Sequence, residues 1–166
     1  MLPSRLNKYH LTTLWKFDAP LELVWKTILD SESWPQWWQG VERVVTLDRG
    51  DASGIGARQR YIWKSALPYR LKFVSRVTRV EPMRILEGRV EGDVEGIGCW
   101  HFGQDKGLTI VRYEWHVQTT RSWMNVLSLF AKPFFRRSHD ALMRAGGQGL
   151  AHHLQTCLVA YQTLRT

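Results

Sequence analysis

The sequence predicts an α+β protein in which a curved antiparallel sheet of about seven strands wraps around one long C-terminal helix. Residues 134–164 place apolar side chains at steps of three or four, which is typical of one face of a long amphipathic helix. Most of the chain before this stretch alternates apolar and polar residues, as strands with one packed and one solvated face do. A long helix and a large sheet each have an apolar face to bury, so we expect them to cover each other.

The elements follow one another in a simple order. Residues 9–17 predict a first strand, and Pro20 followed by an apolar stripe over 21–28 predicts a short helix. Residues 34–38 predict a second short helix or a tight turn. Six further strands are expected over 41–47, 57–65, 69–80, 84–91, 94–103 and 109–119. Residues 122–131 are expected to be helical, with a break or kink at Pro133 before the long helix.

Length and composition indicate one domain over residues 1–166 with a substantial core, since 44% of the residues are hydrophobic. The nine tryptophans require a core that is wide or that encloses something. Cys99 and Cys157 lack the spacing of a disulfide framework or a metal site, which is typical of a reducing compartment. No segment has the pattern of a signal peptide or a membrane span, so we expect a soluble cytoplasmic protein.

The net charge of +8 would suit nucleic acid, an anionic membrane or an acidic substrate as a partner. The basic residues are scattered rather than clustered, which favours a solvated basic surface and ranks nucleic-acid binding last. No motif predicts a cofactor or a phosphate loop. His152 and His153 would point about 100° apart on a helix, so with His101 and His116 they do not predict a metal site.

The whole order of elements resembles the START-like, or Bet v 1-like, superfamily (SRPBCC), and within it the polyketide cyclase/dehydrase and lipid-transport group. The resemblance implies the helix-grip fold. It does not imply one reaction, because carriers, cyclases, hydrolases and ligand sensors share this fold. The segments that carry it are Ala19-Pro20 with Val24-Trp25, Asp30…Trp34-Pro35…Trp37-Trp38, Leu67-Pro68-Tyr69, Gly92-Asp93…Gly96-Ile97-Gly98-Cys99-Trp100, and the C-terminal helix.

Large inward side chains predict a ligand-binding cavity between the sheet and the C-terminal helix. A filled aromatic core is the alternative, and the resemblance favours the cavity, since similar folds often keep one. The residues that we expect to bind the ligand are Trp15, Trp38, Tyr61, Trp63, Tyr69, Phe73, Trp100, Phe102, Tyr113, Trp115, Phe135, His139 and Met143.

The leading functional hypothesis is binding of a hydrophobic small molecule such as a lipid, a polyketide or an aromatic metabolite. The alternative is an enzyme similar to polyketide cyclases and dehydratases that uses polar residues in the same cavity. His139, Tyr61 and Tyr113 are the first candidates for that role, and no motif fixes a catalytic residue. A hydrogen-bonded core histidine is the favoured interpretation of His139, against a ligand-binding or basic one.

Asp93 and Glu95 flank a turn and are expected to be solvated rather than to act as an acid/base pair. Gly146, Gly147 and Gly149 would destabilise a helix. They indicate either close approach to the sheet or room for a ligand, or else a kink.

The segment Ser122–Phe135 is more apolar than one buried face requires. It predicts a lid over the cavity mouth or a transient membrane contact, with Lys132, Arg136 and Arg137 meeting anionic headgroups. Dimerisation, or burial against the sheet edge, is the alternative.

Overall fold

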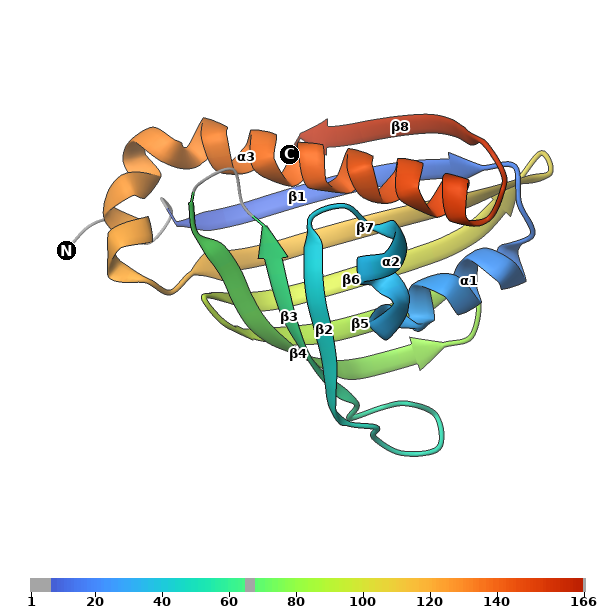
Figure 1. The fold of residues 1–166 in the computed structure, drawn as a ribbon, viewed down its shortest axis with the longest axis horizontal. Coiled ribbons are helices and arrows are strands. Elements are labelled where there is room, and N and C mark those ends of the chain that lie inside the picture. The colour runs from blue at the N-terminus through green and yellow to red at the C-terminus, as the bar shows by residue number, and fades with distance from the viewer. Residues whose placement is uncertain (1–6, 65–67, 166) are drawn as a thin grey trace.

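One antiparallel sheet of eight strands curves around a long helix in the computed structural model, which describes residues 7–64 and 68–165 (Figure 1). The strand order is β2-β3-β4-β5-β6-β7-β1-β8. The strands are β1 (Lys8–Phe17), β2 (Val41–Asp48), β3 (Arg58–Lys64), β4 (Arg70–Glu81), β5 (Ile85–Gly92), β6 (Val94–Asp105), β7 (Leu108–Thr119) and β8 (Leu158–Arg165). The helices are α1 (Leu21–Leu29), α2 (Trp34–Trp37) and α3 (Ser122–His153), with a single 3₁₀ turn at η1 (Ser31–Ser33).

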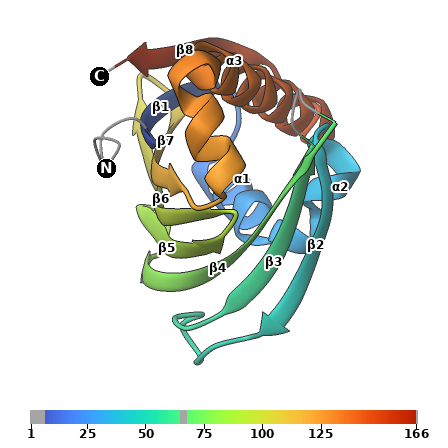
Figure 2. The same cartoon turned by 90° about the vertical axis from the view of Figure 1, so that its left-hand side faces the viewer.

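The alternation of the strands places one face of the sheet in the core, as predicted. In β7, Val111, Tyr113, Trp115 and Val117 are all buried, whereas Arg112 is exposed. Figure 2 shows the sheet curling so that α3 and α1 lie within its concave side. The predicted α+β helix-grip arrangement, with two short helices after the first strand, is confirmed.

The C-terminal helix agrees with its prediction at the start, where it bends without a break, and differs from it at the end. It begins at Ser122 and continues through Pro133, and Figures 1 and 2 show its first turns bent away from the rest. Proline lacks the N–H of a helical hydrogen bond and bends a helix without having to end it. Helix α3 ends at His153. Two residues later, Gln155 takes a left-handed φ of 52°, a conformation that commonly follows the end of a helix. The predicted helix over 134–164 is therefore wrong beyond His153, and β8 is the eighth strand of a sheet expected to have about seven.

The glycines of α3 allow the helix to approach its neighbours closely. A Cβ on Gly146 would collide with the Trp38 indole, and one on Gly149 would collide with the Trp37 carbonyl. The Trp38 Nε1–H donates a 2.8 Å hydrogen bond to the Leu142 carbonyl, which holds α3 against the residue that follows α2. Because α3 is continuous here, close approach explains the glycines and a kink does not. No helix in the described part of the chain has the length and apolar run needed to cross a bilayer.

Candidate ligand-binding site

A cavity of about 410 Å³ lies on the concave face of the sheet, between β3–β7 and the segment that runs from α1 to α2. Ile28, Ser31 and Trp34 cover it from the helical side, and residues 51–54 of the β2–β3 loop lie at its edge. No described residue of α3 lines it. This cavity, called the larger cavity below in contrast to a smaller one beneath α3, therefore lies under α1 and α2, whereas the sequence predicted a cavity under the C-terminal helix.

Two paired glycines form the floor of the larger cavity. Gly88 of β5 faces Gly98 of β6 across the strand pair, and both line the cavity. A Cβ on Gly98 would lie 2.8 Å from the Tyr113 hydroxyl oxygen, and one on Gly88 would lie 2.5 Å from the Ser75 Oγ. Any side chain at these positions would displace those hydroxyls or fill the space, so the absence of two side chains leaves room for the cavity.

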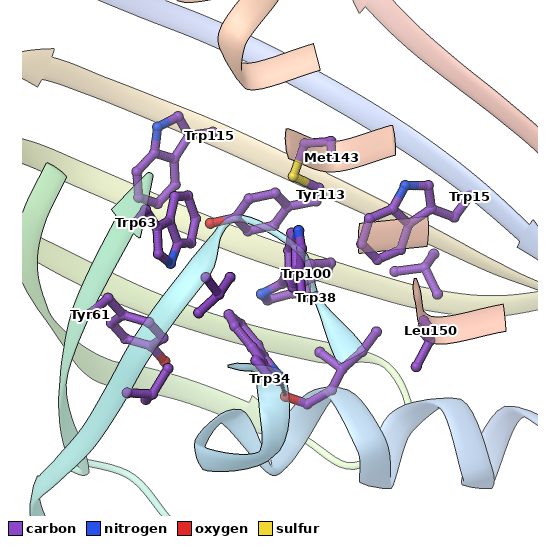
Figure 3. Packing of buried hydrophobic residues seen from close by; sticks show 14 of the residues in the cluster. Trp15, Trp34, Trp38, Tyr61, Trp63, Trp100, Tyr113, Trp115, Met143 and Leu150 are labelled. Carbon is purple, nitrogen blue, oxygen red and sulfur yellow. Dashed lines mark hydrogen bonds between the residues drawn. The ribbon is translucent and has the colours of Figure 1, made fainter. Parts of the chain in front are cut away.

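Seven aromatic side chains are among the described residues that line the cavity, together with polar ones such as Gln59, Ser75 and Glu87. Figure 3 labels six of the aromatic ones: Trp34, Tyr61, Trp63, Trp100, Tyr113 and Trp115. Trp100 stacks on Tyr113 with 4.0 Å between ring centroids, and Tyr61 stacks on Phe73 at 5.2 Å. Trp63 and Trp115 stack at 5.8 Å. These rings present flat apolar faces whose positions are held by their neighbours.

The larger cavity also contains hydroxyl groups that stay neutral. Burial raises the pKa of Tyr61 to about 12, and a side-chain hydrogen bond with Ser31 acts in the opposite direction. Burial raises the pKa of Tyr113 as well, and the nearby Tyr61 adds to the shift. Near neutral pH both phenols can donate and accept hydrogen bonds, but neither is an ionised base. They are suited to orienting a carbonyl or hydroxyl of a ligand.

A second, smaller cavity of about 90 Å³ lies beneath the first half of α3. Tyr9, Phe135 and His139 line it, together with Trp63 and Trp115, which also line the larger cavity. His139 is 9% exposed, and among the described residues neither of its ring nitrogens has a hydrogen-bond partner. Burial lowers its pKa to about 4, against a weaker opposing effect of Asp140. The favoured interpretation of a hydrogen-bonded core histidine was therefore wrong, because His139 is buried but unpaired.

The structure distributes the residues expected to bind the ligand over three places. Six of them line the larger cavity: Tyr61, Trp63, Phe73, Trp100, Tyr113 and Trp115. Trp63 and Trp115 also line the smaller cavity, along with Tyr69, Phe135 and His139. Four others line neither cavity and pack in the core: Trp15, Trp38, Phe102 and Met143.

Asp93 is the residue whose environment was mispredicted most clearly. It was expected to be solvated, yet it is only 2% exposed. Its carboxylate accepts hydrogen bonds from the Tyr69 hydroxyl at 2.7 Å, the Lys72 N–H at 2.9 Å and the Arg121 Nε at 2.7 Å. Burial opposes ionisation, but these donors outweigh it and hold the Asp93 pKa below its ordinary value. Arg121 directly precedes α3, so Asp93 fixes the start of that helix to the sheet.

The start of α3 covers the smaller cavity. Met124 is buried and lines the cavity, and Trp123, 39% exposed, packs edge-on against Tyr69 at 5.0 Å. The side chains of residues 127–131 lie outside the described part, as does Leu67 of the Leu67-Pro68-Tyr69 motif. This covering agrees both with the lid interpretation and with its alternative, burial against the sheet edge, and membrane contact stays a prediction.

Gly88 and Gly98 were the feature of the sequence that could have located the cavity. Gly88 and Gly98 occupy inward positions of two neighbouring predicted strands, where large side chains are the rule. An inward glycine in a strand marks a bulge or space for something else. The partners of Asp93 carried no comparable signal, because Tyr69 and Arg121 are 24 and 28 residues away from it.

Solved structures share this fold at low sequence identity. The Zhui aromatase/cyclase from Streptomyces sp. R1128 is 15% identical, with a TM-score of 0.70 over 89% of this chain and 94% of that one. A START superfamily protein from Mycobacterium smegmatis is 11% identical, with a TM-score of 0.71 over 89% and 98%. The major latex-like protein 151 from Panax ginseng is 6% identical, with a TM-score of 0.69 over 89% and 98%.

A comparison with curated proteins finds no sequence match. The family model described as polyketide cyclase/dehydrase and lipid transport matches residues 17–145. That span begins at the last residue of β1 and ends inside α3, so it includes every strand that lines the larger cavity. The match covers well over half of the sequence, and the chain therefore belongs to the polyketide cyclase/dehydrase and lipid transport family.

Proposed function

We propose that this protein binds a hydrophobic small molecule in the larger cavity. The cavity of about 410 Å³, with aromatic walls and a floor of paired glycines, is the observation that carries the proposal. Ligand sites commonly measure about 300–1,000 Å³ and combine mostly apolar walls with a few placed polar groups. The tyrosine hydroxyls are such groups, and Gln59, Ser75 and Glu87 add further polar atoms to the lining. A lipid, a polyketide or an aromatic metabolite would fit both this lining and the description of the family.

Native mass spectrometry of the freshly purified protein tests the proposal, followed by denaturation and analysis of any released molecule. We expect a near-stoichiometric apolar adduct. Ser75→Phe should reduce the adduct at least about tenfold, because Ser75 lines the cavity and an aromatic ring there would occupy it.

Val74→Phe is the matched control, since it adds the same ring to the adjacent position of β4, which does not line the cavity. Its adduct should equal that of the unmodified protein. An adduct of unchanged amount in a folded Ser75→Phe variant would show that the ligand lies elsewhere.

An enzyme that cyclises or dehydrates a polyketide-like substrate is the second candidate. The observation that favours it is the pair of neutral phenols, Tyr61 and Tyr113, in the same cavity. A neutral phenol can donate a hydrogen bond to a carbonyl oxygen as negative charge develops on it. With a poly-β-ketone substrate, Tyr113→Phe should then slow product formation about 10²-fold or more while leaving binding within a few-fold. Equal rates with and without the protein would reject the enzymatic candidate and leave the binding proposal intact.

A further inference from the structure

The smaller cavity combines apolar walls with buried polar groups that have no partner. Leu11, Leu71, Val94 and Val117 are among its apolar walls. The His139 ring nitrogens, the Tyr9 hydroxyl and the Trp63 Nε1–H are buried without a hydrogen-bond partner in the described part of the chain. All three residues line this one cavity. Unpaired buried polar groups destabilise a folded protein, so a ligand that pairs them would recover the lost interaction.

His139 and Tyr9, the two titratable residues among these, are uncharged near neutral pH. Burial lowers the pKa of His139 to about 4, so the imidazole is neutral and offers one donor and one acceptor. Burial raises the pKa of Tyr9, against an opposing effect of Arg136, so the phenol is neutral as well. Lys64 is the charged residue among those that line this cavity, and it is exposed. Lys132 and Arg136 lie near Tyr9, with the Lys132 Nζ 6.0 Å from the centre of the Tyr9 ring. A carboxylate placed beside His139, away from these cations, would lose water without gaining a charged partner.

The size and position of the smaller cavity limit what it can hold. An apolar cavity of about 150 Å³ is sufficient for one benzene molecule, so about 90 Å³ suits a smaller group such as a carbonyl or hydroxyl with its adjacent carbons. Trp63 and Trp115 line both cavities, so the two cavities adjoin each other at these rings. A ligand held in the larger cavity therefore has the smaller one next to it.

We propose that the smaller cavity is a subsite for the uncharged, hydrogen-bonding end of an elongated ligand, a ketone or an alcohol, with His139 as its hydrogen-bond partner. This inference rests on the proposed function, because the apolar body of the same ligand occupies the larger cavity. His139 would then select ligands whose end carries a hydrogen-bonding oxygen and no charge. The preferred class is then a molecule with an apolar body and a neutral oxygen at one end.

Three probes with similar skeletons test the subsite: n-butylbenzene, 4-phenyl-2-butanone and 3-phenylpropanoate. Their dissociation constants are measured by quenching of tryptophan fluorescence in the full chain. In the unmodified protein the ketone should bind about three- to tenfold more tightly than the hydrocarbon, as expected for one hydrogen bond to a buried group. It should also bind at least about tenfold more tightly than the carboxylate.

Two variants separate hydrogen bonding from shape. His139→Leu should remove the advantage of the ketone while binding of n-butylbenzene changes less than about twofold, because leucine retains apolar bulk and loses both ring nitrogens. His139→Gln should restore part of the advantage, since its amide can donate to the ketone. If His139→Leu fails to fold, ¹⁵N NMR of the unmodified protein gives an independent test. The His139 ring signals should shift with 4-phenyl-2-butanone and stay in place with n-butylbenzene.

The outcomes distinguish this inference from the proposed function. Binding of n-butylbenzene with no gain for the ketone, or a gain that survives His139→Leu, would overturn the subsite and leave the larger cavity as the binding site. Tighter binding of 3-phenylpropanoate than of the ketone would also overturn it, and would indicate a cation near the cavity, Lys64, Lys132 or Arg136, as the partner. If none of the three probes binds, the subsite is overturned, and the native mass spectrometry described above decides separately whether the proposed function fails.

Discussion

Asp93 joins three separate parts of the chain through one carboxylate. Tyr69 and the Lys72 N–H lie at the start of β4, Asp93 lies between β5 and β6, and Arg121 lies just before α3. Arg121 is 58% exposed in its side chain, so its ion pair with Asp93 contributes little by itself. The hydrogen bonds from Tyr69 and Lys72 therefore account for most of the stabilisation.

Replacing Asp93 with Asn should lower the free energy of unfolding by about 2–3 kcal/mol, because an amide nitrogen must face one of the three donors. Chemical denaturation at pH 7 measures the change. Glu91→Gln is the control, since Glu91 is exposed and its pair with Arg89 should be worth less than about 0.5 kcal/mol. Equal effects of the two substitutions would contradict the assigned role of Asp93.

The contribution of Asp93 should also depend on pH. Its folded-state pKa is lowered below the ordinary value of 3.8, so its stabilisation is complete above that value. The stabilisation is lost as pH falls through the lowered pKa. The difference in stability between the unmodified protein and Asp93→Asn should thus be constant from pH 7 down to about 5 and shrink below about pH 4. A difference that stays constant down to the acid-unfolding region would argue against a charged Asp93.

Replacing Gly146 with alanine should destabilise the protein, which is the opposite of the usual effect inside a helix. Alanine normally stabilises the interior of a helix by about 1 kcal/mol relative to glycine. Here the added Cβ would collide with the Trp38 indole, so Gly146→Ala should destabilise the protein by about 1–3 kcal/mol in thermal or chemical denaturation. Gln148→Ala, two residues along on the exposed side of α3, should change stability by less than about 0.5 kcal/mol. Stabilisation by Gly146→Ala would mean that α3 does not approach Trp38 closely.

At the scale of the elements, β8 attaches the end of the chain to both the sheet and α3. It pairs with β1 along its length, from Leu158 opposite Phe17 to Arg165 opposite Leu11. The Tyr161 hydroxyl donates a 2.9 Å hydrogen bond to the Asp140 carbonyl of α3, and the Arg144 guanidinium lies 4.6 Å from the centre of the Tyr161 ring. The strand thus stabilises the position of the helix that precedes it.

Hydrogen exchange measured by NMR should show the edge position of β8 directly. In an edge strand, alternate N–H groups point toward the neighbouring strand and the others point to solvent. Residues 158–165 should therefore alternate between slow and fast exchange, while the interior strand β1 should be protected at consecutive positions. Continuous protection over 150–164 would instead support the helix expected from the sequence.

The sequence predicted most elements correctly because their periods were long and regular. The strands from β4 to β7 alternate over eight or more residues. The segment around Leu158–Leu164 was ambiguous, since Tyr161 and Leu164 satisfy a helical spacing while Leu158, Val159 and Ala160 form a short apolar run. Periodicity cannot separate the two possibilities in so short a run. Helix α3 ends at His153, and the left-handed residue just beyond it is Gln155 instead of the usual glycine, so no glycine marked this end in the sequence.

At the scale of the whole molecule, all five tyrosines have raised pKa values. Burial is the leading cause for each of them, including Tyr61 and Tyr161, whose pKa values rise to about 12. The folded protein therefore holds protons that the unfolded chain releases near its ordinary tyrosine value of 10. Stability that is present below pH 10 is lost as pH rises from there toward 12.

Absorbance at 295 nm tests this prediction. The folded protein should show little tyrosinate at pH 10, and the signal should rise together with alkaline unfolding followed by circular dichroism. In 6 M guanidinium (about the concentration that unfolds most domains) the five tyrosines should titrate near pH 10. Titration of several tyrosines near pH 10 while the protein stays folded would contradict the buried positions.

The site was less predictable than the fold, for a physical reason. The inward aromatic residues could be named from alternation, and six of them line the larger cavity. Whether aromatic rings enclose space or fill it depends on distances between strands and helices that no local pattern encodes. Gly88 and Gly98 decide that question here only because they are paired across two strands. The unpaired state of His139 depends in the same way on residues far from it in sequence.

The pairing of β8 with β1 also determines how the protein would respond to a mechanical load. Arg165 lies opposite Leu11, so the two ends of the described chain meet at the same end of this strand pair. A force that pulls these ends apart would break the hydrogen bonds between β1 and β8 one after another, as a zipper opens, instead of loading them together. Two strands whose hydrogen bonds break one at a time separate at low force. Stretching from the ends would peel β8 away before it disturbed the cavities on the concave face of the sheet.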